Sequence, residues 1–204
     1  MSDRDAVQRH CAGDDLAAAR QTLREFLAEN FGSAASFAAR EAMAMAERLD
    51  LPEFRVVMLS SFTIDPLEPN LQVSEFLSGR RLAFDSIPYE QWQGALAAPG
   101  PIDEAAPDVI VLLRHLEDAA PLLAHRHLAA NAEDLVRESE GVIGAIAEVL
   151  SAYRRRSAVP IILSTFISAS RGIERHFDRR VEPSRQGAID VLNARLAEIA
   201  REIP

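Results

Sequence analysis

The sequence contains a single cysteine, Cys11, among its 204 residues. No disulfide can therefore form within the chain, and a cysteine-based metal site is not expected. A glycine-rich phosphate loop is also missing, because neither G-x-G-x-x-G nor the Walker-type pattern occurs. The sequence thus predicts neither a metal nor a cofactor.

Long apolar runs and positive charge are scarce as well. No stretch approaches the ~20 apolar residues that a membrane-spanning helix needs, and the polar N-terminus lacks the apolar core of a signal peptide. These features predict a cytoplasmic protein that does not bind a membrane. The net charge of −9 argues against nucleic acid as a partner.

The first 50 residues contain no strand-like run, and apolar residues fall on one helical face from Leu16 to Leu27 and on another from Phe37 to Leu49. This pattern predicts an N-terminal helical hairpin extension over residues 1–52, with a break near residues 30–33. A single hairpin of this size is not stable alone, so it must pack on the rest of the chain or on a second copy, as in a homodimer. Its apolar stripe comprises Leu23, Phe26, Leu27, Phe37 and Met45.

Residues 53–204 alternate between strand-like and helix-like patterns, which predicts an α/β domain. Strand-like runs occur at 55–60, 82–87, 108–113 and 159–165, and helix-like stretches at 66–79, 89–98, 131–153 and 184–201. Alternation of this kind implies right-handed crossovers and a mostly parallel sheet. Because the segments "VVML", "VIVLL" and "VPIIL" within these runs are apolar throughout, both faces of the sheet should be covered. We therefore expect a three-layer α/β/α fold.

Polar side chains follow each strand-like run, and sites in open parallel sheets form beyond the carboxyl ends of the strands. Arg114 is the expected anion contact, since its fixed fork of donors suits a carboxylate or a phosphate. Ser60 and Thr63 flank the first strand end as further substrate contacts. One cleft is expected to be faced by Ser61, Gln91, Arg114, His115 and Thr165.

Ser61 has two interpretations, which the residues alone leave open. A serine directly after a strand and close to a helix N-terminus can act as a nucleophile, with backbone N–H groups nearby to hold an oxyanion. Alternatively, Ser61 or Thr63 caps the helix that begins near Pro66. His115 is a catalytic base, a substrate contact or a loop histidine without a function.

Four segments in order resemble the N-terminal region of FkbH-like proteins, whose second half is a haloacid-dehalogenase-type domain. The segments are "VVMLSSFTIDPLEPNLQVSEFL", "FDSIPYEQWQGAL", "APDVIVLLRHLED" and "VPIILSTF". The resemblance implies a fold similar to SGNH (GDSL-type) hydrolases, which is related in layout to flavodoxin-like folds. It places Ser61 at the position of the hydrolase nucleophile.

The sequence departs from the hydrolase pattern around that position. Ser60 replaces the aspartate of the L-G-D-S-L-T block and Leu59 replaces its glycine. The tip at 114–118 lacks the glycine and asparagine of the G-x-N-D block, and the closing D-x-x-H block is expected only beyond Pro204. Most of the machinery that activates the serine is therefore absent or altered.

The resemblance implies a role in loading glycerate-derived units onto an acyl carrier protein for polyketide or related pathways. In FkbH-like proteins the haloacid-dehalogenase-type half dephosphorylates 1,3-bisphosphoglycerate and transfers the glyceryl group. The D-x-D-x-[TV] match at residues 3–7 has no strand before it, so it is a coincidence.

Three functions remain open at this point. The first is a domain that positions an acyl or glyceryl substrate, or an acyl carrier protein, for a haloacid-dehalogenase-type partner domain. The second is a serine esterase or acyltransferase with Ser61 and His115 as catalytic residues. The third is an interaction module whose helical hairpin docks a carrier protein or a second subunit.

Overall fold

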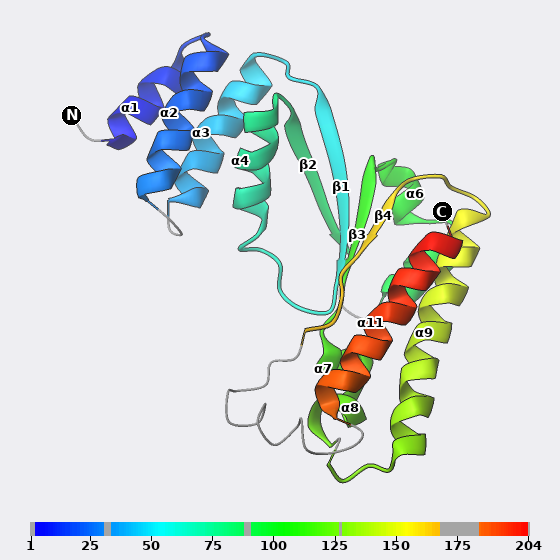
Figure 1. Cartoon of the computed structure of the whole chain (residues 1–204). Helices are drawn as coiled ribbons and strands as arrows, with labels where there is room; N and C mark the ends of the chain where they lie inside the picture. The colour runs from blue at the N-terminus through cyan, green and yellow to red at the C-terminus, as the bar shows by residue number, and fades with distance from the viewer. Residues whose placement is uncertain (1–2, 31–33, 88–90, 127, 168–183, 204) are drawn as a thin grey trace. The chain divides into compact units, whose positions relative to one another are not determined.

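The computed structural model describes residues 3–30, 34–87, 91–126, 128–167 and 184–203 (Figure 1). It has an α/β fold in which helices flank a four-stranded, all-parallel sheet of order β2-β1-β3-β4. The predicted fold class is therefore confirmed. The strands are β1 (Glu53–Ser60), β2 (Arg81–Ile87), β3 (Val109–Leu113) and β4 (Ile161–Leu163).

The helices lie before, between and after these strands. The helices predicted between the strands and after the last strand occur within a few residues of their predicted positions. Three short helices were not predicted: α6 before β3, and α7 and α8 after it. The helices are α1 (Asp3–Ala12), α2 (Leu16–Glu29), α3 (Ala35–Arg48), α4 (Glu68–Ser78), α5 (Trp92–Ala97), α6 (Pro101–Ala105), α7 (Leu116–Ala119), α8 (Pro121–His125), α9 (Ala132–Arg154) and α11 (Arg185–Glu202). Over the described ranges, none of them is both long enough and apolar enough to cross a membrane.

The chain divides into two compact units. Unit 1 comprises Met1–Val56 and Thr63–Asp85, and unit 2 comprises Val57–Phe62 and Ser86–Pro204. The division predicted from the sequence, with a helical extension over 1–52 and an α/β domain over 53–204, stays a prediction.

Unit 1 has a core built by the N-terminal helices together with α4. Helices α2 and α3 lie where the hairpin was predicted, and α1 adds the buried side chains of Val7 and Cys11. The predicted stripe residues enter this core, Leu27 and Phe37 only partly buried. Val73 and Phe76 of α4 complete it. The N-terminal helices therefore pack on a helix of the following segment. The core also contains Ala19, Leu23, Phe26, Ala34, Ala38, Ala39, Ala42, Met45 and Ala46.

Helix α4 ends at Gly79, which has a left-handed conformation with φ of 91°. Glycine adopts this conformation without the steric cost that a Cβ brings. Arg20 covers the same helix end, because its Nε donates to the Phe76 carbonyl at 3.0 Å, and its guanidinium occupies the space where a Cβ on Gly79 would lie. Gly79 is thus required by both its backbone conformation and its neighbour.

Substitution Gly79→Ala is expected to lower the free energy of unfolding by about 1–2 kcal/mol, through backbone strain and displacement of Arg20. Urea unfolding monitored by circular dichroism measures the loss. The matched control is Gly141→Ala in α9, where a Cβ meets nothing within 4 Å and should stabilise the helix by about 0.5–1 kcal/mol. Equal stabilities of the Gly79→Ala variant and the parent would show that this helix end tolerates a side chain.

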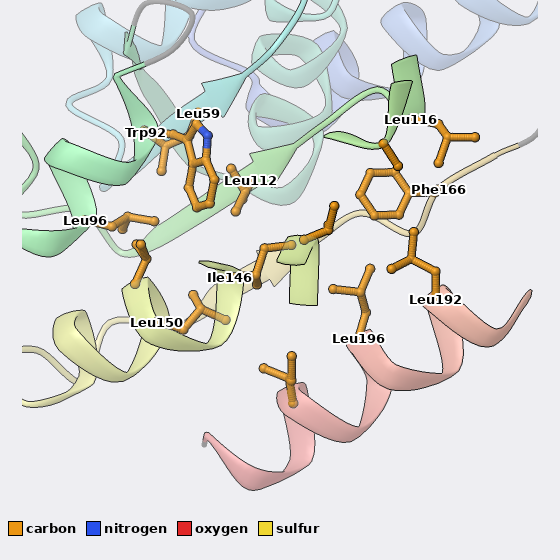
Figure 2. Packing of buried hydrophobic residues seen from close by; sticks show 14 of the residues in the cluster. Leu59, Trp92, Leu96, Leu112, Leu116, Ile146, Leu150, Phe166, Leu192 and Leu196 are labelled. Carbon is orange, nitrogen blue, oxygen red and sulfur yellow. The ribbon is translucent and has the colours of Figure 1, made fainter. Parts of the chain in front are cut away.

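Unit 2 has a second core, which lies between the carboxyl half of β1, β3 and the two long helices α9 and α11. Asn131 caps α9 as predicted, since its side chain accepts from the Asp134 N–H at 2.8 Å. Figure 2 shows Ile146 and Leu150 of α9 close to Leu112 of β3. The labelled members of this core are Leu59, Trp92, Leu96, Leu112, Leu116, Ile146, Leu150, Phe166, Leu192 and Leu196.

Candidate functional site

Ser61 extends the pairing of β1 with β3 by one step beyond the end of the strand. Its N–H donates to the Leu113 carbonyl at 3.1 Å, as in a regular parallel ladder. The next bond of the ladder is made by its side chain, because Ser61 Oγ accepts from the His115 N–H at 2.9 Å. The Ser61 hydroxyl thus accepts the N–H bond that the Ser61 main-chain carbonyl would accept in a regular ladder.

Ser164 makes the same arrangement on the β4 side of β3. Its N–H donates to the Leu112 carbonyl at 3.0 Å, and its Oγ accepts from the Arg114 N–H at 3.3 Å. The two serines therefore bind successive amides at the tip of β3 from opposite sides. Each hydroxyl accepts one bond and retains its own hydrogen for donation.

The two interpretations of Ser61, as a nucleophile or as a helix cap, can now be compared with its contacts. Helix α4 begins after Leu67 and has no side-chain cap, so the cap interpretation of Ser61 and Thr63 is wrong. Ser61 instead fixes the backbone of His115. Whether it can also act as a nucleophile depends on a base at its oxygen.

His115 does not place its ring at that oxygen. The ring stacks on Phe62, with centroids 4.1 Å apart and an interplanar angle of 14°. In the part of the chain that the structure describes, no hydrogen bond joins a ring nitrogen of His115 to Ser61 Oγ or to the Glu117 carboxylate. The His115 backbone N–H, and not its ring, is therefore bonded to the Ser61 hydroxyl, so the two residues do not form a nucleophile–base pair.

A cavity of about 330 Å³ opens at the tips of β3 and β4. Three residues predicted to share a cleft line it: Arg114, His115 and Thr165. The guanidinium of Arg114 lies 4.8 Å from the centre of the buried Trp92 ring, in a cation–π contact. Further lining side chains are Phe62, Ser164 and Glu117.

The remaining predicted site residues lie elsewhere. Gln91 is exposed at the start of α5 and does not line the cavity. Ser60 is occupied by its own turn, since its Oγ donates to the Phe62 carbonyl at 2.8 Å and accepts from the Phe62 N–H at 3.1 Å. Thr63 is exposed and belongs to unit 1.

A larger groove of about 1080 Å³ lies between α9 and α11, which run side by side in Figure 1. Its lining is mainly apolar and includes the exposed side chains of Val136 and Val191. None of the predicted site residues contributes to it. The candidate site is therefore the smaller cavity, whose lining includes residues with cationic, hydroxyl and carboxylate side chains.

The single cysteine takes no part in this site. Cys11 is buried in the core of unit 1, and burial, with a smaller contribution from the charge of Glu41, raises the pKa of its thiol to about 11. It therefore remains protonated at neutral pH and is a poor nucleophile. Among the described residues, no three His, Cys, Asp or Glu side chains lie together as a metal site would require.

Comparisons with known proteins give one informative likeness. No protein-family model matches the chain, and no curated protein matches it in sequence. Among solved structures, it resembles the N-terminal part of the protein BF1531 from Bacteroides fragilis, described as containing a phosphatase domain complexed with Mg, with a TM-score of 0.60 and 14% identity. The match covers 81% of this chain and 43% of the other, so this chain spans less than half of that protein's length. At this identity the likeness shows the fold alone.

Proposed function

We propose that this chain positions an acyl or glyceryl substrate, presented on an acyl carrier protein, for a haloacid-dehalogenase-type partner domain in polyketide or related biosynthesis. The ordered segments that resemble the N-terminal region of FkbH-like proteins support this proposal. So does the structural likeness to a protein whose described N-terminal part contains a phosphatase domain. We infer from both that the chain is an α/β domain that accompanies a phosphatase domain.

The observation that carries the proposal is the way the two strand-end serines are used. Ser61 and Ser164 each accept an N–H bond from the tip of β3, and His115, the histidine beside them among the described residues, stacks on Phe62. The two hydroxyl oxygens thus accept bonds from the backbone, and each hydroxyl keeps its hydrogen for donation to a ligand. A site of this kind suits binding better than nucleophilic attack, which requires a base at the oxygen.

The cavity also has the chemistry that a glycerate-derived ligand requires. The Arg114 fork can pair with a carboxylate or phosphate, and the Ser164 and Thr165 hydroxyls can donate to the same group. Glu117 supplies an acceptor for the hydroxyl groups of a glyceryl unit. The lining therefore offers a partner of matching chemistry to each group of an anion that carries hydroxyl groups.

Binding of 3-phosphoglycerate to the chain, measured by calorimetry and by NMR titration, tests the site. We expect saturable binding that Arg114→Ala weakens about 10–100-fold, because a hydrogen bond to a charged group contributes about 1.5–3 kcal/mol. Arg201→Ala, a change at an exposed arginine of α11, should leave the affinity unchanged.

The partner is tested with an acyl carrier protein loaded with a glyceryl unit, in comparison with the unloaded carrier. NMR shifts at the amides of Arg114, His115 and Thr165 should respond to the loaded carrier only. If the parent does not bind 3-phosphoglycerate, or if Arg114→Ala binds it equally well, the proposed use of this cavity is wrong.

A further inference from the structure

A side chain outside the cavity at the tips of β3 and β4 is hydrogen-bonded to the segment that lines one side of that cavity. Asn193, in the middle of α11, makes two hydrogen bonds to the backbone of a single distant residue. Its Oδ1 accepts from the Phe166 N–H at 2.8 Å, and its Nδ2 donates to the Phe166 carbonyl at 2.9 Å. Only this orientation of the amide satisfies both groups, because the reverse would set donor against donor and acceptor against acceptor.

Phe166 is fixed by its side chain as well as by its backbone. It is 4% exposed, and Figure 2 shows its ring beside Leu192 and Leu196 of α11 and beside Leu116. Its N–H and its carbonyl both pair with the Asn193 side chain, and within the described residues neither group belongs to a strand, since β4 ends at Leu163. The amide of Asn193 thus takes the place that a neighbouring strand would have.

The segment between two such attachments forms one wall of the cavity. At one end, Ser164 is held by its bonds to β3, and at the other end Phe166 is held by Asn193. Thr165, between them, is exposed and lines the cavity. The positions of the Ser164 and Thr165 hydroxyls therefore depend on both attachments.

We propose that Asn193 is a positioning residue, which holds the backbone at Phe166 so that Ser164 and Thr165 present their hydroxyls to an anionic ligand. The effect on a ligand rests on the proposed function, whereas the restraint on the backbone does not. Helix α11 thereby contributes to ligand affinity although none of its side chains lines the cavity.

Amide hydrogen exchange and 3-phosphoglycerate binding together test the inference on the full chain. In Asn193→Ala, we expect the Phe166 amide to exchange at least about tenfold faster and the affinity to fall by about three- to tenfold. Asn193→Asp retains an acceptor for the Phe166 N–H and should recover part of that protection. It should not recover the affinity, because a carboxylate oxygen then faces the Phe166 carbonyl.

The matched control is Asn131→Ala, which makes the same chemical change at the cap of α9. It should lower the melting temperature and leave both the Phe166 exchange and the affinity unchanged, so a general loss of stability is separated from a local restraint. Unaltered Phe166 exchange in Asn193→Ala, or equal effects of the two alanine variants, would overturn the inference. Absence of binding in the parent, with faster Phe166 exchange only in Asn193→Ala, would reject the proposed function and retain the restraint.

Discussion

Deletion of residues 1–50 is expected to leave a chain that aggregates or melts at least about 10 °C lower than the parent. The three helices removed share their core with α4, whose Val73 and Phe76 are 3% and 0% exposed. Exposing the two side chains costs about 1.5–3 kcal/mol each, a large part of a typical folding free energy of about 5–15 kcal/mol. Solubility on gel filtration and thermal unfolding measure the outcome.

Point substitutions in the same helices distinguish lost packing from the effect of a shorter chain. Leu23→Ala, at a side chain with 0% exposure, should destabilise the parent by about 2–5 kcal/mol. Its neighbour Arg24 is exposed, and Arg24→Ala should stay within about 0.5 kcal/mol of the parent. A truncated chain as soluble and stable as the parent would show that α4 does not need its N-terminal neighbours.

The strands and long helices could be predicted because their signals are local. The VVML segment of β1 and the whole of β3 are apolar, and α9 carries its own cap at Asn131. Helix α1 was missed because it buries only Val7 and Cys11 in an otherwise polar segment, too few positions to define a helical period. Helices α6, α7 and α8 have five residues or fewer, which is also too short for a period.

The site could be predicted only in part, for a physical reason. The predicted cleft rests on the gathering of strand ends in a parallel sheet, and it comprises Ser61, Gln91, Arg114, His115 and Thr165. Arg114, His115 and Thr165 line the cavity, whereas Ser61 and Gln91 do not. The role of Ser61 could not be predicted, because its hydroxyl accepts a hydrogen bond from the His115 N–H, which lies 54 positions away in the sequence. Asn193 likewise has a role only through Phe166, 27 positions away, and nothing in its helical sequence marks it.

The histidines limit what Ser61 can do as a nucleophile. His10 lies in α1, where its Nδ1 is paired with Thr22 Oγ1 at 2.9 Å, and His125 ends α8. His127 and His176 lie outside the described residues. Among the histidines that the structure describes, His115 is the candidate base beside Ser61, and it would have to leave its stack on Phe62 and gain an orienting carboxylate. The oxygen it would activate already accepts the His115 N–H.

The chain is therefore expected to hydrolyse activated esters at least about three to four orders of magnitude more slowly than a serine hydrolase with a complete triad. A p-nitrophenyl ester assay, with labelling by a serine-reactive phosphonate, measures this. Ser61→Ala and the matched Ser164→Ala should leave the residual turnover unchanged. Each should lower the free energy of unfolding by about 0.5–1.5 kcal/mol, since an amide of the β3 tip loses its acceptor. Robust turnover and labelling that Ser61→Ala abolishes and Ser164→Ala preserves would establish the esterase instead.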